Sequence, residues 1–204
     1  MGNVVIDVSM SIDGFVAGPD DSEVVTLGEN GERLHEWMFG RDKQYAGDAR
    51  IIEEVNDRVG AVLMGRRTFD IGLPNWGDVP FPVPCFVLTH RPRGEEVANS
   101  GTFAFVTGGP EAALRRARAA AGGRDVLVMG GDTGRQCLAA GLVDEMHIHL
   151  VPVLLGRGVR LFEYPGAGEH SGPGPHGTGP LGWTAPQVTQ SPHVTHLRYR
   201  RRPA

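Results

Sequence analysis

The stretch VLVMGGDTGRQCLAAGLVDEMHIHLVPVLLGRGVRLF, residues 126–162, contains the alternation that decides the fold. An apolar run over 125–129 ends at two glycines, and 133–140 has helical character. A second apolar run follows over 144–153, and a short one over 159–162. Apolar runs bounded by glycine are typical of buried strands, and strands that alternate with helices are typical of a parallel sheet. This part of the chain therefore predicts an α/β fold.

The same alternation extends toward both ends of the chain. Helices are predicted over 31–39, 46–58 and 111–121, and strands over 4–9, 61–64, 83–89 and 103–107. The last two predicted strands, 183–190 and 194–200, suit an antiparallel hairpin. We expect a mostly parallel central sheet with antiparallel C-terminal strands.

Length and composition exclude several classes of protein. The 204 residues fit one globular domain, 1–204, and the net charge of −4 argues against a general polyanion binder. No apolar stretch approaches the roughly 18–20 residues of a membrane helix. The N-terminus lacks a basic region and carries Asp7 and Asp13, unlike a signal peptide. Two cysteines, Cys85 and Cys137, are too few and too far apart for a disulfide framework or a zinc site. We expect a soluble, cytoplasmic protein without a membrane or nucleic-acid partner.

A segment rich in glycine and proline lies near the C-terminal end. Of the 18 residues in 165–182, 11 are Gly or Pro. Such a composition offers few side chains to bury and loses much backbone entropy on ordering. We expect a flexible loop within the domain.

Three predicted strands end in residues that suit a phosphorylated ligand. Glycine allows a close approach of the backbone, and the start of a helix offers free N–H groups. The candidate residues at these ends are Gly65, Arg66, Arg67 and Thr68; Thr89, His90 and Arg91; and Gly130, Gly131, Asp132 and Thr133. Taken singly, a Gly-Gly pair is most often a tight turn and an arginine a solvated charge. Together they indicate a site for a ligand with several phosphates, because ligands of parallel sheets bind at the carboxyl ends of strands.

The expected ligand is a dinucleotide with a 2′-phosphate. The chain has no G-x-G-x-x-G motif and no strand-end acid placed to hold a ribose 2′-hydroxyl. Cations at the strand ends suit a 2′-phosphate instead, which favours NADPH over NADH.

Several segments carry a resemblance to the dihydrofolate reductase-like superfamily. The similarity is strongest to the reductase domain of the bifunctional deaminase-reductase proteins of riboflavin biosynthesis. It covers nearly the whole chain outside the Gly/Pro-rich loop. The segments are VVIDVSMSIDGFVAG (4–18), VLMGRRTF (62–69), FVLTHRP (86–92), residues 126–162 and THLRYRR (195–201).

The resemblance implies a three-layer fold, NADPH bound across the strand ends, and hydride transfer to a pterin-, pyrimidine- or sugar-derived molecule. It implies phosphate contacts at 65–68, the adenosine 2′-phosphate at 89–91, the pyrophosphate at 130–133 and the nicotinamide near Ala17. It also implies a homodimer, for which the apolar segment 150–156 and the terminal strands offer surface.

Asp13, in SMSIDGFVAG, is the candidate catalytic residue, to orient the substrate or a proton-delivering water. The alternative is a turn residue, since Asp-Gly is a common loop pair. Trp37 and Trp76 are candidates for the substrate side, although aromatic residues at such spacings are more often core. In folate-reducing relatives a carboxylate on the first helix holds the pterin ring, but Glu32 and Glu36 in 31–39 do not match it convincingly, which puts folate as the substrate in doubt.

Histidines and arginines near the C-terminus have ordinary interpretations. His147 and His149 share one face of a strand, and we expect a half-exposed face rather than a metal site. His170 and His176 fall in the Gly/Pro-rich loop. The basic run 198–202 is expected to be solvated or part of an oligomer contact. The leading prediction is an NADPH-dependent reductase, and the alternatives are an NADP-binding protein without turnover and an interaction module that uses the basic run.

Overall fold

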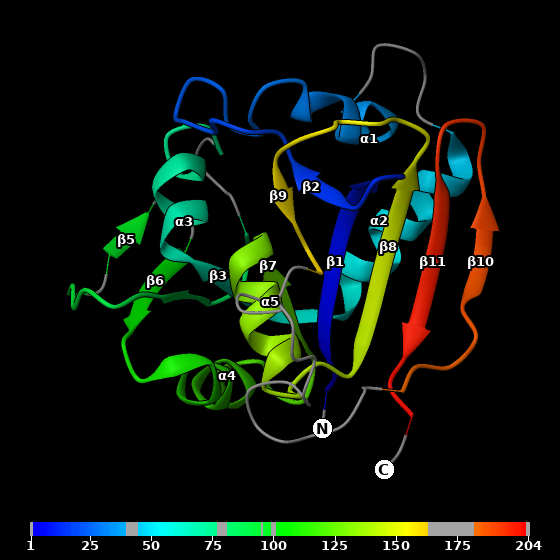
Figure 1. The fold of residues 1–204 in the computed structure, drawn as a ribbon. Helices are drawn as coiled ribbons and strands as arrows, with labels where there is room; N and C mark the ends of the chain where they lie inside the picture. The colour runs from blue at the N-terminus through cyan, green and yellow to red at the C-terminus, as the bar shows by residue number, and fades with distance from the viewer. Residues whose placement is uncertain are drawn as a thin grey trace, which may run out of the picture.

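The computed structural model describes residues 2–39, 45–76, 81–94, 96–98, 101–162 and 182–202, with 96–98 and 101–102 described by their backbone alone. Its centre is a sheet of nine strands in the order β10-β11-β8-β1-β7-β3-β4-β6-β5 (Figure 1). The strands from β8 to β6 are parallel, and β5, β10 and β11 are antiparallel at the two edges. The parallel strands are β1 (Val4–Ser11), β3 (Val59–Gly65), β4 (Cys85–Leu88), β6 (Gly101–Val106), β7 (Asp125–Met129) and β8 (Glu145–Val151); the edge strands are β5 (Glu96–Ala98), β10 (Gln187–Gln190) and β11 (Thr195–Arg200).

Helices cover both faces of this sheet, which gives three layers (Figure 1). In the view of Figure 1, α4 (Gly109–Ala120) and α5 (Gly131–Ala139) lie in front of the sheet, and α2 (Ala46–Arg58) lies behind it. On the face of α2 lie also α3 (Arg66–Gly72), the 3-10 turn η1 (Gly31–His35) and α1 (Glu36–Phe39). A separate pair of short strands, β2 (Phe15–Ala17) and β9 (Val159–Arg160), lies over the carboxyl end of β1.

The central strands are buried on both faces because helices cover each of them. Along β3, Ala61 and Leu63 pack in the cluster that contains residues of α4 and α5. Val62 and Met64 point the other way and pack with Phe69 of α3. All four strand residues have no exposed surface. This explains why 61–64 is a continuous apolar run without alternation.

The sequence expectations hold for the sheet and for most helices. The bounds of α2 and β7 are the predicted ones, and the C-terminal strands form the predicted antiparallel hairpin. Three elements were not predicted: α3, which is only seven residues long, and the three-residue strands β2 and β5. Such short elements carry too few residues to show a period. The predicted helix 31–39 is a 3-10 turn followed by one turn of α-helix.

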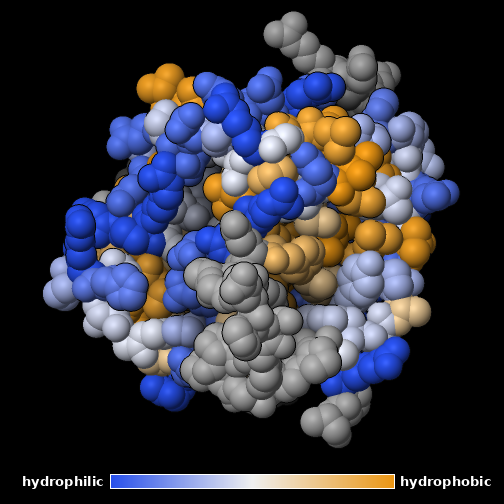
Figure 2. Space-filling model, in the orientation of Figure 1, coloured by the Kyte–Doolittle hydropathy of each residue, from blue (hydrophilic) through white to orange (hydrophobic). Residues whose placement is uncertain are grey.

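The Gly/Pro-rich loop predicted over 165–182 lies outside the described residues, apart from Gly182. In the described part of the chain, no helix is both long and apolar enough to cross a membrane. Figure 2 shows the surface of the protein in the orientation of Figure 1. Hydrophilic residues cover the region where Figure 1 places α3, and apolar residues lie near the carboxyl ends of β1 and β8. The exposed apolar side chains there include Ile12 and Leu154.

The packing of β3 predicts the cost of a cavity at its centre. Leu63→Ala should lower the free energy of unfolding by about 2–5 kcal/mol, because the side chain is fully buried between layers. The matched control is Val188→Ala on the edge strand β10, where the side chain is 53% exposed, and its effect should stay within about 0.5 kcal/mol. Urea denaturation measures both, and equal losses would contradict this description of the core.

Candidate functional site

A cleft of about 1160 Å³ opens at the carboxyl ends of β1, β3, β4 and β7. Parallel strands bring these ends to one edge of the sheet, so residues distant in sequence meet there. Every residue predicted to bind the cofactor lines this cleft: Ala17, Gly65, Arg66, Arg67, Thr68, Thr89, His90, Arg91, Gly130, Gly131, Asp132 and Thr133. Trp76 lines it as well, whereas Asp13 and Trp37 do not.

Two strand-to-helix turns form the centre of the cleft and pack against each other. A Cβ atom on Gly65 would lie 2.6 Å from the Thr133 hydroxyl oxygen, and one on Gly130 would lie 2.4 Å from the Thr68 hydroxyl oxygen. Each glycine thus accommodates the threonine of the other turn. Gly130 also has a φ of +90°, which side chains rarely allow. Glycine at both positions therefore lets β3 and β7 end side by side.

The helix that follows the second turn begins with unused backbone donors. Gly130 is the N-cap of α5, and no side chain caps this helix start. The first N–H groups of a helix have no partner within the helix, and the helix dipole places partial positive charge there. Because Gly131, Asp132 and Thr133 line the cleft, this helix start suits an anionic group.

The arginines of the cleft differ in what they already bind. The Arg66 side chain pairs with Asp70 at 2.8 Å, and the Arg67 guanidinium pairs with Asp21 at 2.5 Å. Arg91 is exposed, and its guanidinium has no hydrogen bond or ion pair with the described part of the chain. The backbone N–H of Arg91 donates to the Thr89 hydroxyl at 3.1 Å, which shapes this turn. Arg91 is thus the cleft arginine with the most capacity left for a phosphate.

Asp13 lies outside the cleft and organises a loop. Its carboxylate accepts hydrogen bonds from the backbone N–H groups of Leu155, at 3.2 Å, and Gly156, at 2.7 Å. A hydrogen bond with Ser11 contributes most to a lowered pKa of this carboxyl, and these two backbone groups lower it further. The geometry matches the alternative of a turn residue, and its predicted catalytic role stays a prediction without support from its position.

The two tryptophans predicted on the substrate side have different surroundings. Trp37 is buried, and its indole N–H donates to the Ser9 hydroxyl at 3.0 Å, so it lies behind the cleft wall. Trp76 lines the cleft, lies over Gly72 and packs edge-on against Phe81 with ring centres 5.6 Å apart. Of the two residues, only Trp76 lies where a substrate could touch it.

Next to the two turns, the cleft has a largely apolar half. The side chains there come from α1, α2, α3 and the flanking loops, and they are Leu27, Met38, Ile51, Ile52, Val55, Ile71, Trp76 and Phe81. Glu32 and Glu36 are exposed and do not line the cleft. In the described structure the first helix therefore brings no carboxylate to this half.

Sequence reasoning missed Asp7 and His149, which line the cleft beside this apolar half. Asp7 is in the middle of β1, opposite His147 of β8. The available signal was a carboxylate inside an otherwise apolar strand, VVIDVS. A charge is costly to bury without a partner, so such a residue indicates a partner on a neighbouring strand.

The prediction of a half-exposed face for His147 and His149 is wrong, because α2 covers it. The two side chains are only 6% and 3% exposed. Asp7 accepts from both rings, at 3.2 Å from His147 Nδ1 and 3.0 Å from His149 Nε2. Burial alone would raise the pKa of Asp7, but the two histidines hold it below its ordinary range. Among the described residues, no group of three metal-ligating side chains is placed to hold a metal ion.

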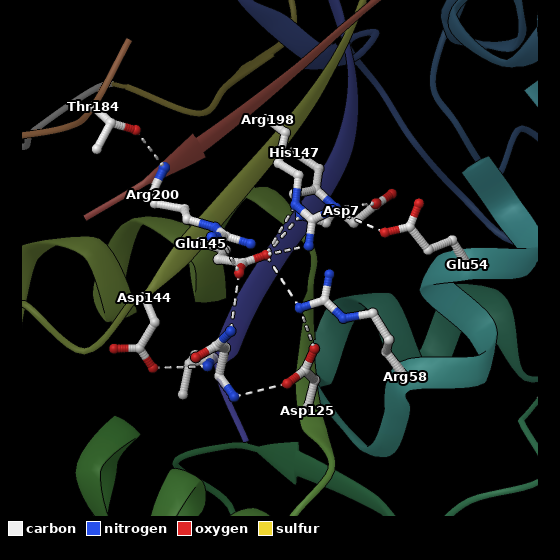
Figure 3. Close-up of polar contacts among 12 residues, drawn as sticks. Asp7, Glu54, Arg58, Asp125, Asp144, Glu145, His147, Thr184, Arg198 and Arg200 are labelled. Carbon is white, nitrogen blue, oxygen red and sulfur yellow. Dashed lines mark hydrogen bonds and ion pairs between the residues drawn. The ribbon is translucent and has the colours of Figure 1, made fainter. Parts of the chain in front are cut away.

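Behind Asp7, the same polar layer continues to Glu145 (Figure 3). The Glu145 carboxylate contacts His147 Nε2, Arg58 and Arg198 at 3.1–3.2 Å. Arg200 also approaches it, at 3.4 Å. Arg198 and Arg200 belong to the basic run 198–202, so part of this run is committed to an internal ion pair. Burial opposes ionisation of Glu145, but the hydrogen bond from His147 and the charges of Arg198 and Arg58 lower its pKa to about 2.

The two turns predict different outcomes for two alanine substitutions. Gly65→Ala should cost about 1–3 kcal/mol of unfolding free energy by overpacking, and adding Thr133→Ala should remove most of that cost. Gly130→Ala should stay costly even with Thr68→Ala, because its φ of +90° remains. Chemical denaturation of the four variants measures this, and equal rescue at both turns would contradict the geometry.

The low pKa of Glu145 predicts acid-sensitive stability. The ordinary value is 4.5 and the folded value about 2, so between these values the unfolded chain binds a proton that the folded chain does not. The contribution of Glu145 is complete above about pH 4.5 and is lost as the pH falls toward 2, with a slope of up to about 1.4 kcal/mol per pH unit. Glu145→Gln should flatten this part of the curve of unfolding free energy against pH. An unchanged slope in that variant would show that other groups cause the acid loss.

Comparison with known proteins identifies the family of the chain and supports its fold. The sequence model of the RibD C-terminal domain family matches residues 3–173. No curated protein matches the chain. A protein assigned to riboflavin biosynthesis from Shewanella sp. PV-4 has a similar structure, with a TM-score of 0.69, 22% identity, and coverage of 98% of this chain and 99% of that one.

Two further solved structures share the fold. Dihydrofolate reductase from Enterococcus faecalis, solved as a complex with NADP(H), has a TM-score of 0.59 and 12% identity, with coverage of 99% and 98% of the two chains. RibD from Acinetobacter baumannii has a TM-score of 0.63 and 17% identity, and the match covers 99% of this chain but 58% of that protein. The chain belongs to the RibD C-terminal domain family, a reductase family with the dihydrofolate reductase-like fold.

Proposed function

We propose that the chain is an NADPH-dependent reductase that transfers a hydride to a small pterin-, pyrimidine- or sugar-derived molecule. The observation that supports it most is the meeting of three phosphate-suited strand ends at one cleft: Gly65–Thr68, Thr89–Arg91 and Gly130–Thr133. When bound there, the reduced nicotinamide would supply the hydride, and the protein contributes orientation and exclusion of water.

The cleft has donors that fit the phosphates of such a cofactor. The start of α5 offers uncapped backbone N–H groups beside Gly130, where a side chain would obstruct a close approach. Arg91 and His90 are exposed at the neighbouring strand end and suit a 2′-phosphate. Arg66 and Arg67 would have to share their guanidinium groups between a phosphate and the carboxylates of Asp70 and Asp21.

The apolar half of the cleft suits the nicotinamide and the substrate. Ala17 lines the same cleft, and Trp76 and Phe81 offer aromatic surface for a flat ring. One end of the cleft thus favours anions and the other favours planar, largely apolar groups, as a dinucleotide beside a heterocycle requires.

The alternative is an NADP-binding protein without turnover. The position of Asp13 outside the cleft favours this alternative, since that residue supplies no catalytic group there.

A screen of NADPH oxidation separates the two functions. It should include dihydrofolate and 5-amino-6-(5-phosphoribosylamino)uracil, since the latter is named for the deaminase/reductase from Thermotoga maritima, which this chain matches over 56% of that protein's length. Binding of NADPH without oxidation by any candidate would favour the alternative, and a chain that binds no NADPH would exclude both. The expected homodimer and cytoplasmic location stay predictions.

Arg91 provides the sharpest test of cofactor choice. Arg91→Ala should weaken NADPH by about 10- to 100-fold, the loss of one or two charge-assisted hydrogen bonds, and should leave NADH binding nearly unchanged. Calorimetric titration with both nucleotides measures this. The matched control is Arg115→Ala on the exposed face of α4, away from the cleft, which should leave both affinities unchanged. Equal losses for NADPH and NADH in Arg91→Ala would remove the 2′-phosphate assignment.

A further inference from the structure

Two buried histidines connect the cleft carboxylate Asp7 to a second buried carboxylate, Asp48 of α2. His149 of β8 contacts Asp7 through Nε2 at 3.0 Å, and its Nδ1 lies 2.7 Å from Nδ1 of His196 on β11. His196 in turn contacts Asp48 through Nε2 at 3.1 Å. The four residues form one continuous chain of hydrogen bonds that we call the Asp-His-His-Asp chain.

The geometry of this chain requires one proton more than two neutral imidazoles carry. A carboxylate accepts, so His149 and His196 each use Nε2–H to donate to their own aspartate. The contact between the two Nδ1 atoms needs a further proton, because two bare ring nitrogens 2.7 Å apart would repel. With both carboxylates ionised, the two rings together hold three protons and one positive charge.

The titratable groups nearest to the chain lie on η1, α2, β8 and β11. Burial lowers the pKa of His196 and also that of His35, which lies near His149 on η1. His149 lies directly against the carboxylate of Asp7, and His196 against that of Asp48. The other titratable groups on the packed elements are His147 and Glu145 of β8, Arg58 and Glu54 of α2, and Arg198 of β11.

The chain also joins two cavities. Asp7 and His149 line the large cleft. His149 and His196 line a second cavity of about 70 Å³, with Gln187 and Thr189 of the edge strand β10 at its exposed side. His149 therefore separates the cleft from a small cavity large enough for water.

We propose that the Asp-His-His-Asp chain is the proton source for the reduction in the cleft, with Asp7 as the group that meets the substrate. The proposal rests on the proposed reductase function. It assigns Asp7 a catalytic role and makes His149, His196 and Asp48 positioning residues that hold and replace the proton.

The proposed step balances as follows. When bound in the cleft, the reduced nicotinamide would supply a hydride to the carbon of a C=N or C=O bond in the substrate, and the π electrons would move to the nitrogen or oxygen. Asp7 takes the proton from His149 Nε2 and passes it to that nitrogen or oxygen, so the carboxylate is anionic before and after. The two rings then share two protons and carry no net charge, and a proton from solvent restores the third before the next turnover. One hydride and one proton would be consumed for each substrate molecule reduced.

Nuclear magnetic resonance of the ¹⁵N-histidine-labelled protein tests the additional proton without cofactor or substrate. At pH 8, the rings of His149 and His196 should together show three protonated nitrogens, with the exposed His193 as internal reference. In Asp48→Asn the side-chain amide can donate to His196 Nε2. His196 then donates through Nδ1, and the two rings should together show two protonated nitrogens at pH 8, one on each ring. Two neutral rings in the unmodified protein would overturn the proposal, and this result is distinct from a failure of NADPH binding.

Kinetics then separates proton supply from structural support. With a substrate found by the screen, Asp48→Asn should lower kcat about tenfold or more at pH 8. At pH 6 the loss of kcat should be small, because the higher proton concentration restores the third proton of the two rings. KM for NADPH should be unchanged. The control is Glu53→Gln on the same helix, whose exposed side chain lines neither the cleft nor the small cavity, and it should not change the pH profile. A loss that is equal at both pH values would show a structural role alone and overturn the proposal.

Discussion

The site depends on the close packing of two strand-to-helix turns at one edge of the sheet. Gly65 receives the hydroxyl of Thr133, and Gly130 receives that of Thr68, so β3 and β7 can end side by side with both following helices starting at the cleft. A larger residue at either glycine would push the turns apart. The predicted phosphate-binding residues lie around this contact. The contact between the two turns therefore determines how these residues are arranged in the cleft.

The part of the cleft wall that contains Asp7 is formed by buried charged and polar groups. Asp7 interrupts an apolar strand, and α2 and β11 cover the histidines that pair with it, so a layer of charged groups lies inside the protein. Buried charges are tolerated when each has hydrogen-bonded partners of opposite sign. Here hydrogen-bonded groups extend from Asp48 to Glu145, and the two histidines beside Asp7 hold its pKa below the ordinary range next to the apolar half of the cleft.

The sequence allowed the sheet, most helices and the strand-end residues that line the cleft to be predicted, because apolar runs and strand-end glycines are local signals. It could not place Asp13 or Trp37, since their surroundings come from distant segments: Leu155 and Gly156 for Asp13, and Ser9 of β1 for Trp37. The burial of His147 and His149 was missed for the same reason, because only the folded chain shows α2 over that face of β8.

A crystal structure of the protein grown with NADP⁺ tests the central claim most directly. The account predicts the pyrophosphate against the backbone of Gly130 and Gly131, the 2′-phosphate at Arg91 and the nicotinamide near Ala17, with Asp7 left open to a substrate. A dinucleotide bound elsewhere on the molecule, or a cleft that stays empty at saturating NADP⁺, would contradict it.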